Sequence, residues 1–242
     1  MEIARFIWRA WKYRLGSDRT EIEKMLSIVK RSQNCVDIGA HKGAYTFWLS
    51  KAVGLTGHVD AFEPQPQLAK LLQSLLAAAD ICNTEVHQIA LSNKSGFTYL
   101  QVPLRIGGTP SASLENLKSG LDSHRIKVLT TTLDEFYDGH FARPISFIKC
   151  DAEGHELEIF QGGERTIRED RPVILFECEA RHHSKEKMLC TFDFLLSKNY
   201  YGFFFHNSEL RPLRDFDPDF HQDENLRRSA NNFLFMPAKI SG

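Results

Sequence analysis

Short apolar runs alternate with amphipathic helical segments through the middle of the chain. The apolar runs lie at residues 35–39, 57–62 and 84–91. Between them, residues 43–53 and 67–79 repeat apolar side chains at the three- and four-residue spacing of a helix. Strands that alternate with helices pair in parallel through right-handed crossovers. The pattern therefore predicts an α/β domain built on a doubly wound, mostly parallel sheet.

Later segments extend the same predicted sheet. Nearly continuous apolar runs at residues 144–150 and 172–177 are typical of central parallel strands. Helix periodicity returns at residues 184–198. Residues 201–206 and 232–236 then predict a pair of strands that ends the sheet, with an antiparallel strand at the terminus.

The stretch between residues 96 and 137 departs from this alternation. Residues 96–102 and 126–131 predict two extra strands, and residues 132–137 predict a short helix. The segment between the two strands is rich in Gly, Pro and Ser, which favours a loop. We expect this loop, residues 107–121, to cover the cleft of the sheet.

Residues 2–14 place aromatic and aliphatic side chains among basic ones, which predicts an amphipathic helix. Such a helix packs on the domain or on a second subunit, so a homodimer is one expectation. The alternative is contact with an anionic membrane surface. Ser17 or Asp18 is positioned to cap a second helix that runs through Arg31. We thus expect an N-terminal helical extension at residues 1–31 and the main domain at 32–242.

Composition narrows the classes of partner. The 30 Lys and Arg residues nearly balance 31 Asp and Glu, so no bulk positive field exists to attract nucleic acid, and we expect no such partner. No apolar run approaches the ~20 residues of a membrane span, so no integral membrane segment is expected. The five cysteines form no C-x-x-C pair and are expected to be reduced thiols of a cytoplasmic protein.

The turn after the first strand carries the main clue to a ligand. A dinucleotide site requires G-x-G-x-x-G, so that the backbone approaches a pyrophosphate closely. When that template starts at Gly39, the second glycine position holds His41, whose side chain would block the pyrophosphate. Asp37 would add negative charge beside it. The turn therefore disfavours an NAD-dependent oxidoreductase.

S-adenosyl-L-methionine fits this turn better because it carries an ammonium, a sulfonium and a carboxylate but no phosphate. Asp37 suits the cationic amino acid part, and Gly39 allows close approach of the backbone. The amides near Gly43 open a helix and suit the carboxylate. Glu63 ends the second strand at a distance that suits an acid accepting both ribose hydroxyls.

A polar cluster follows the fourth main strand. Asp151, Glu153 and His155 alternate around a turn that Gly154 allows to be sharp. His155 has a suitable ordinary pKa for the base that takes up the acceptor proton. Asp151 and Glu153 are expected to orient the acceptor or hold the methionine ammonium. Each also has a structural alternative: a helix cap for Asp151, an ion pair with Lys149 or an arginine for Glu153, and helix packing for His155.

Possible metal ligands lie at the same strand ends. Asp151, Glu153 and Glu177 offer oxygen atoms for Mg²⁺, with Glu177 otherwise paired to Arg181. We expect no metal, because carboxylates at strand ends are common without one. Cys178, with the histidines at 182 and 183, lacks the paired spacing of a structural zinc site.

The motifs resemble those of the FkbM family of S-adenosylmethionine-dependent methyltransferases. The matching runs are residues 36–43, 61–64, 89–92, 132–135, 147–158, 162–163 and 172–177. The resemblance implies a class I methyltransferase fold for the main domain and methyl transfer to a hydroxyl of a sugar or secondary metabolite. Two departures are His41, where Asn is common, and Cys150, where an aliphatic residue is usual. The positions that the resemblance and the turn chemistry together assign to the cofactor are Asp37, Gly39, Ala40, Gly43, Glu63, Pro64, Ala90 and Asp151.

Three rival functions remain open at this point. One is an N-methyltransferase of the same fold, for which replacement of His155 would matter less because nitrogen needs less base assistance. Another is the oxidoreductase that His41 disfavours. The third is a non-catalytic interaction module that retains the fold, which the joint presence of Asp37, Gly39, Glu63 and Asp151 disfavours.

Overall fold

The computed structural model describes residues 2–103, 113–114, 123–138, 144–180, 184–223 and 229–238. Apart from residues 113 and 114, the loop expected at 107–121 lies outside the described residues. Arg181 and the two histidines that follow it also lie outside them.

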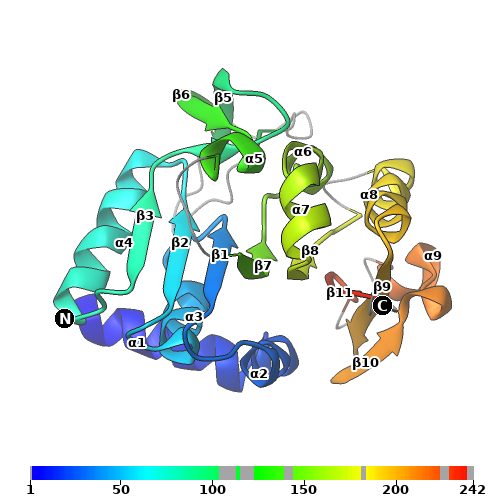
Figure 1. The fold of residues 1–242 in the computed structure, drawn as a ribbon, viewed down its shortest axis with the longest axis horizontal. Coiled ribbons are helices and arrows are strands. Elements are labelled where there is room, and N and C mark those ends of the chain that lie inside the picture. The colour runs from blue at the N-terminus through cyan, green and yellow to red at the C-terminus, as the bar shows by residue number, and fades with distance from the viewer. Residues whose placement is uncertain are drawn as a thin grey trace.

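Within the described residues, eight strands form the central sheet (Figure 1): β1 (Asn34–Ile38), β2 (His58–Phe62), β3 (Thr84–His87), β7 (Ile145–Cys150), β8 (Val173–Glu177), β9 (Tyr200–His206), β10 (Glu209–Pro212) and β11 (Asn232–Pro237). Their order is β10-β9-β11-β8-β7-β1-β2-β3. The five strands from β8 to β3 pair in parallel, whereas β11 is antiparallel to both β8 and β9. The predicted mostly parallel sheet with an antiparallel final strand is confirmed, and that strand lies between β8 and β9.

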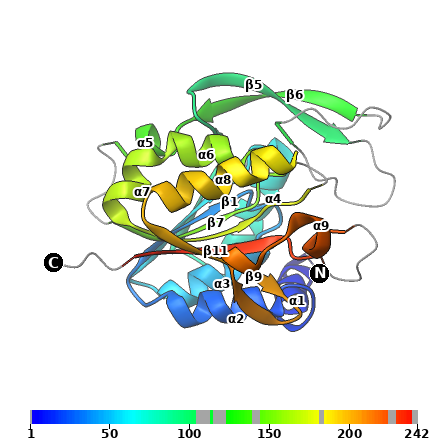
Figure 2. The same cartoon turned by 90° about the vertical axis from the view of Figure 1, so that its right-hand side faces the viewer.

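Helices cover both faces of the sheet (Figures 1 and 2): α1 (Glu2–Leu15), α2 (Arg19–Ile28), α3 (Ala44–Val53) and α4 (Pro66–Ala78) on one, and α5 (Leu133–Phe136), α6 (Glu156–Gly162), α7 (Glu164–Asp170) and α8 (Lys185–Ser197) on the other. The alternation of side chains along a strand explains the two layers. In β1, Cys35 joins the core under α1 to α4, while Val36 and Ile38 join the opposite core. Within the described residues, no helix has both the length and the apolar character that a bilayer crossing requires.

The single strand predicted at 84–91 is wrong. The chain leaves the main sheet after His87, and Ala90 and Leu91 form β4 (Ala90–Leu91) of a second sheet. This sheet adds β5 (Gly96–Pro103) and β6 (Ser123–Thr131), an antiparallel pair that confirms the two extra strands. An apolar run alone does not reveal that the chain changes from one sheet to another, because such a run is buried in either sheet, as Ala90 and Leu91 are here.

The second helix and the end of the chain also differ from the predictions. Helix α2 ends at Ile28 rather than Arg31, because Val29 adopts an extended conformation. Asp18 stands at its N-cap position, but the Asp18 carboxylate accepts a hydrogen bond from the Tyr45 hydroxyl (3.0 Å) instead of capping the helix. Strand β10, the 3₁₀ turn Leu213–Asp215 and α9 (Pro218–His221) were not predicted.

The N-terminal helix packs into the same core as the sheet. Phe6 is 1% exposed and meets the edge of Phe47 at 5.6 Å between ring centroids. The Trp48 indole N–H donates to the Ala10 carbonyl oxygen at 2.9 Å. Trp8, on the outer side of α1, is 63% exposed. The expectation that this helix packs on the domain is confirmed.

We expect Phe6→Ala to destabilise the whole fold. Removal of a fully buried phenylalanine loses its transfer free energy and leaves a cavity, which together cost about 3–5 kcal/mol. Trp8→Ala is the matched control, since truncation of an exposed aromatic should change stability by about 0.5 kcal/mol or less. Urea unfolding followed by circular dichroism measures both, and equal effects would contradict the packing of α1 described here.

Candidate active site

A cavity of about 430 Å³ opens at the carboxyl ends of β1, β2 and β7. This is where doubly wound sheets bind their ligands. The second sheet supplies an apolar side to the cavity, and α1 and the turn that follows it supply a polar one. Among the described residues, the lining includes every residue expected at the site except Gly43: Asp37, Gly39, Ala40, Glu63, Pro64, Ala90, Asp151, Glu153 and His155.

The turn after β1 is held in place by backbone contacts with both neighbouring strands. The amides of Gly39 and Ala40 donate to the Phe62 carbonyl oxygen at 2.9 and 3.0 Å, and the Asp151 amide donates to Ile38 at 2.9 Å. Gly39 has φ +75°, and a Cβ there would lie 1.9 Å from the Asp151 carbonyl oxygen. Only glycine therefore fits at position 39, where β1 and β7 come together.

Gly43 stabilises the turn after β1 but does not line the cavity. Its amide donates to the Ala40 carbonyl oxygen at 2.7 Å, which closes the turn. Its φ is +75°, and a Cβ would meet Leu72 Cδ1 at 2.4 Å. The Gly43 amide is thus already engaged, and the residue fixes where α3 begins.

Asp37 lies at the carboxyl end of β1 with almost no exposed surface. The Thr46 hydroxyl on α3 donates to its Oδ2 at 2.5 Å. Burial raises the pKa of Asp37 to about 6, against the opposing effects of the Thr46 hydrogen bond and the Lys149 charge. The Thr46 hydrogen bond thus fixes the orientation of the Asp37 carboxylate in the cavity lining.

Glu63 follows β2 and uses both carboxylate oxygens. Its Oε2 accepts the His41 amide at 2.8 Å and its Oε1 accepts the Gln65 amide at 2.9 Å. Burial raises the pKa of Glu63 to about 7, although these two hydrogen bonds act in the opposite direction. Burial also lowers the pKa of the His41 imidazole to about 4, so this ring in the cavity lining is neutral.

Asp151 and Glu177 form an acidic pair beside a buried lysine. Lys149 is 2% exposed on β7, and its Nζ lies 4.0 Å from Asp151 Oδ2. Burial raises the pKa of Asp151 to about 6, and a hydrogen bond from Glu177 favours its anion. Burial and the Asp151 charge raise the pKa of Glu177 well above its ordinary range. The surroundings therefore favour the protonated form more strongly at Glu177 than at Asp151.

The turn at residues 151–155 is organised by a residue whose role was not predicted. Glu156 is buried at the first position of α6, and its Oε1 accepts the amides of Ala152 (2.9 Å) and Gly154 (3.3 Å). Within this turn Glu153 has φ +50°, which is unusual for a side-chain-bearing residue. The Ser113 hydroxyl donates to the Glu153 carbonyl oxygen at 2.7 Å. The turn is thus fixed from both sides, which presents Glu153 to the cavity.

His155 lies at the N-cap position of α6 and reaches the cavity wall. Its Nε2 is 2.9 Å from the Ser92 hydroxyl, and its Nδ1 is 3.7 Å from Glu158 Oε2. Glu158 in turn pairs with Lys187 at 2.9 Å. An acidic neighbour at Nδ1 favours a proton on that nitrogen and a basic lone pair on Nε2.

Two features of the cavity escape sequence reasoning. The sequence predicts Lys149 only as an ion-pair partner, although a lysine inside an apolar central strand is itself a signal of a buried charge network. Helix α1 contributes Arg9 and Tyr13 to the lining, and the turn before α2 contributes Ser17 and Asp18, which periodicity does not reveal because it depends on tertiary packing.

Comparison with protein families decides the identity of the domain. The model described as "Methyltransferase FkbM domain" matches residues 37–216, most of the chain. The chain belongs to the FkbM family of S-adenosylmethionine-dependent methyltransferases. The resemblance noted from the motifs is thereby confirmed. No curated protein sequence matches this FkbM chain significantly.

Solved structures agree with the class I methyltransferase fold. An FkbM methyltransferase from Methylobacillus flagellatus KT is similar with a TM-score of 0.54 and 19% identity, over 96% of this chain and 58% of that one. The present chain thus spans little more than half the length of that relative. An O-methyltransferase from Bacillus cereus in complex with SAH gives 0.55 and 13%, over 98% and 90%. A putative rRNA-methylase from Clostridium thermocellum gives 0.55 and 11%, over 92% and 95%.

The raised pKa of Glu63 makes the stability of this FkbM domain depend on pH. The folded chain binds a proton at Glu63 up to about pH 7, whereas the ordinary value is 4.5. The resulting stability is complete below about pH 4.5 and is lost as the pH rises through about 7. We expect Glu63→Gln to reduce the difference in unfolding free energy between pH 5 and pH 8 by about 2 kcal/mol.

Urea unfolding of both proteins at the two pH values measures this difference. The side-chain amide of the Glu63→Gln variant loses one of the two backbone hydrogen bonds at either pH. Only the change in unfolding free energy between the two pH values is therefore diagnostic. A variant with the full pH dependence of the original protein would place the responsible group elsewhere.

Proposed function

We propose that the protein transfers a methyl group from S-adenosylmethionine to a hydroxyl oxygen of a small hydroxylated acceptor, a sugar or a secondary metabolite. The observation that carries the proposal is the strand-end cavity, in which Asp37, Glu63 and Asp151 surround a turn that admits no side chain at Gly39.

The residues present fit this cofactor. Asp37 and Asp151 supply negative charge for its cationic amino acid part, and both have raised pKa values that a cation in the cavity would lower again. Glu63 retains lone pairs for the ribose hydroxyls in addition to its two backbone hydrogen bonds. Ile89 and Ala90 give an apolar wall for the adenine. When bound, the cofactor supplies a methyl group made electrophilic by its sulfonium.

The chain's own residues then orient the acceptor and take its proton. His155 is the proposed base, with Glu158 next to Nδ1 and Nε2 available once the acceptor hydroxyl replaces Ser92 as its hydrogen-bond partner. Asp151 and Glu153 are proposed to orient the acceptor.

A second hollow supports a hydroxylated acceptor. It has a volume of about 670 Å³ and shares Ser17, Asp18 and Glu177 with the first cavity. Its remaining lining includes the hydroxyls and amides of Thr20, Ser208, Asn207, Asn231 and Asn232, which donate to and accept from hydroxyl groups. The two hollows together offer a cofactor cavity that continues into a polar acceptor space.

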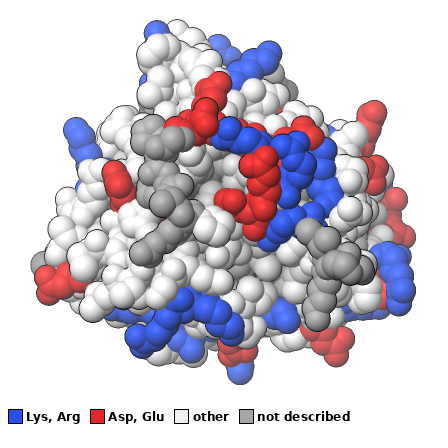
Figure 3. Space-filling view, viewed as in Figure 1, with Lys and Arg blue, Asp and Glu red and all other residues white. Residues whose placement is uncertain are grey.

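Charge and thiol chemistry support the remaining expectations. On the face drawn in Figure 3, Lys and Arg side chains lie beside Asp and Glu side chains, and carboxylates line both hollows. This favours a small molecule over nucleic acid as the acceptor. All five cysteines are free thiols, which fits the proposed cytoplasmic location. The N-terminal helix is the proposed contact of a homodimer, and its exposed Trp8 and Trp11 support this.

Calorimetric titration with S-adenosylmethionine tests the cofactor. We expect micromolar binding to the original protein and at least about tenfold weaker binding to Asp37→Asn, because the variant loses the charge that faces the cation. Asp60→Asn is the matched control, an equally buried aspartate of the neighbouring strand that lies outside the cavity lining. NAD is the control ligand. Absence of heat with folded protein would support the non-catalytic module instead.

Replacement of His155 tests the reaction. With a hydroxyl acceptor, we expect His155→Gln to lower kcat by about 10²–10⁴ with unchanged affinity for S-adenosylmethionine, because only proton removal is affected. His124→Gln, an exposed histidine of β6, should leave kcat unchanged. An unaltered rate in His155→Gln would reject the base role, and turnover of amines alone would establish N-methylation.

A further inference from the structure

Four side chains of metal-binding type share one face of two neighbouring strands. β2 carries His58 and Asp60, and β3 carries Glu85 and His87. Residues two apart on a strand point to the same face, and the parallel register places Asp60 directly beside Glu85. The sequences H-x-D and E-x-H thus bring two imidazoles and two carboxylates into one group at the edge of the main sheet.

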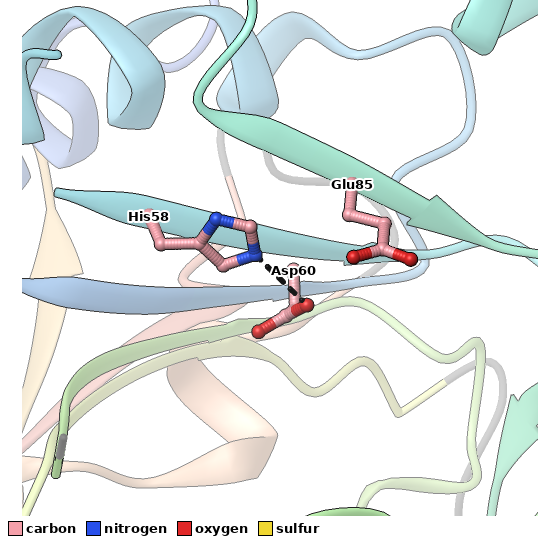
Figure 4. A group of neighbouring side chains, drawn as sticks. All are labelled: His58, Asp60 and Glu85. Atoms are coloured by element: carbon pink, nitrogen blue, oxygen red, sulfur yellow. Dashed lines mark hydrogen bonds and ion pairs between the residues drawn. The ribbon is translucent and has the colours of Figure 1, made fainter. Parts of the chain in front are cut away.

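The group is compact, as Figure 4 shows for three of its members. One ligand atom from each of His58, Asp60 and Glu85 lies within 4.8 Å of the others. His58 Nε2 is 3.3 Å from Asp60 Oδ1, and His87 Nε2 is 2.7 Å from the same oxygen. Both imidazoles therefore converge on Asp60 Oδ1.

Asp60 is buried and firmly oriented. Its other oxygen, Oδ2, accepts the Tyr137 hydroxyl at 2.8 Å. The Tyr137 hydroxyl thus fixes the direction of the Asp60 carboxylate, as outer hydrogen-bond donors do for carboxylates that bind metals.

The opposite edge of the group is open to solvent. β3 is the last strand of the main sheet, and the Glu85 side chain is 64% exposed. An ion has an entry path there, past an exposed carboxylate toward the buried one. None of the four residues belongs to the described lining of the methyltransferase cavity, so this group is separate from the site assigned above.

We propose that His58, Asp60 and Glu85 bind one divalent transition-metal ion of the zinc type, and that His87 leaves its hydrogen bond with Asp60 to become a fourth ligand. Two imidazole nitrogens and two carboxylate oxygens suit Zn²⁺, whereas Mg²⁺ and Ca²⁺ prefer oxygen ligands alone. Ligand atoms about 2.1 Å from a tetrahedral ion lie roughly 3.4 Å apart, close to the 3.3 Å between His58 and Asp60. The 2.7 Å between His87 and Asp60 is a direct hydrogen bond, which lengthens when the ion binds between the two side chains. The ion would link edge strand β3 to β2 and so stabilise the sheet margin.

The competing explanation is a purely hydrogen-bonded cluster, in which Asp60 is satisfied by its two imidazoles and Tyr137. Titration of the chelator-treated full chain with Co²⁺, followed by visible absorption and then by displacement with Zn²⁺, separates the two. We expect one tetrahedral Co²⁺ per chain, displaced by Zn²⁺ but not by a large excess of Mg²⁺.

Single-residue variants test which side chains bind the ion. Glu85→Gln changes an exposed residue and should weaken binding at least about tenfold, and His58→Ala should abolish it. His124→Ala, outside the group, should bind as the original protein does. Zn²⁺ should also raise the melting temperature of the original chain and of His124→Ala, but not of His58→Ala. Binding of S-adenosylmethionine should be the same in all four, which separates this test from that of the proposed function.

Two outcomes would overturn the proposal. One is the absence of a tetrahedral Co²⁺ spectrum in the original protein, which would leave the hydrogen-bonded cluster as the explanation. The other is equal binding in the original protein and in a folded His58→Ala, which would place the ion at other histidines or cysteines of the chain.

Discussion

The architecture of the site depends on the close approach of two backbones at the ends of β1 and β7. The Asp151 carbonyl oxygen occupies the space in which any side chain at position 39 would lie. This contact brings the turn after β1 against the turn after β7, and Asp37 and Asp151 therefore reach the same cavity. A larger residue at position 39 would separate the strands and disperse the carboxylates, so one missing Cβ determines the geometry of the whole pocket.

The cavity concentrates charge that the fold alone would not favour. Burial raises the pKa of Asp37, Glu63, Asp151 and Glu177, which means that each carboxylate destabilises the folded state once it ionises. The positive charge of Lys149 on β7 offsets part of this destabilisation. The Lys149 Nζ also donates to the Cys150 carbonyl oxygen. Such conflict between stability and residue choice is expected where a site serves a ligand.

Much of this arrangement follows from local patterns. Strand ends are visible in a sequence, so the pattern alone groups Asp37, Glu63 and Asp151, and all three line one cavity. The division of residues 84–91 between two sheets is not predictable in this way, because a buried apolar run has the same appearance in either sheet. The role of Glu156 depends on two amides that face it only after the turn has formed. The contribution of α1 to the lining depends on the packing of Phe6, which no periodicity specifies.

Helix α1 contributes both to the hydrophobic core and to the wall of the cavity. Phe6 anchors the helix in the core, while Arg9 and Tyr13, on the same helix, line the cavity. The Arg9 guanidinium also donates to the Lys42 carbonyl oxygen in the turn that follows β1 (3.2 Å). Fraying of the first helix would therefore remove part of the cavity wall, and a ligand that contacts this wall would oppose fraying by mass action. The resistance of the N-terminal helix to proteolysis thus reports whether a ligand occupies the cavity, although most of the cavity lining lies later in the sequence.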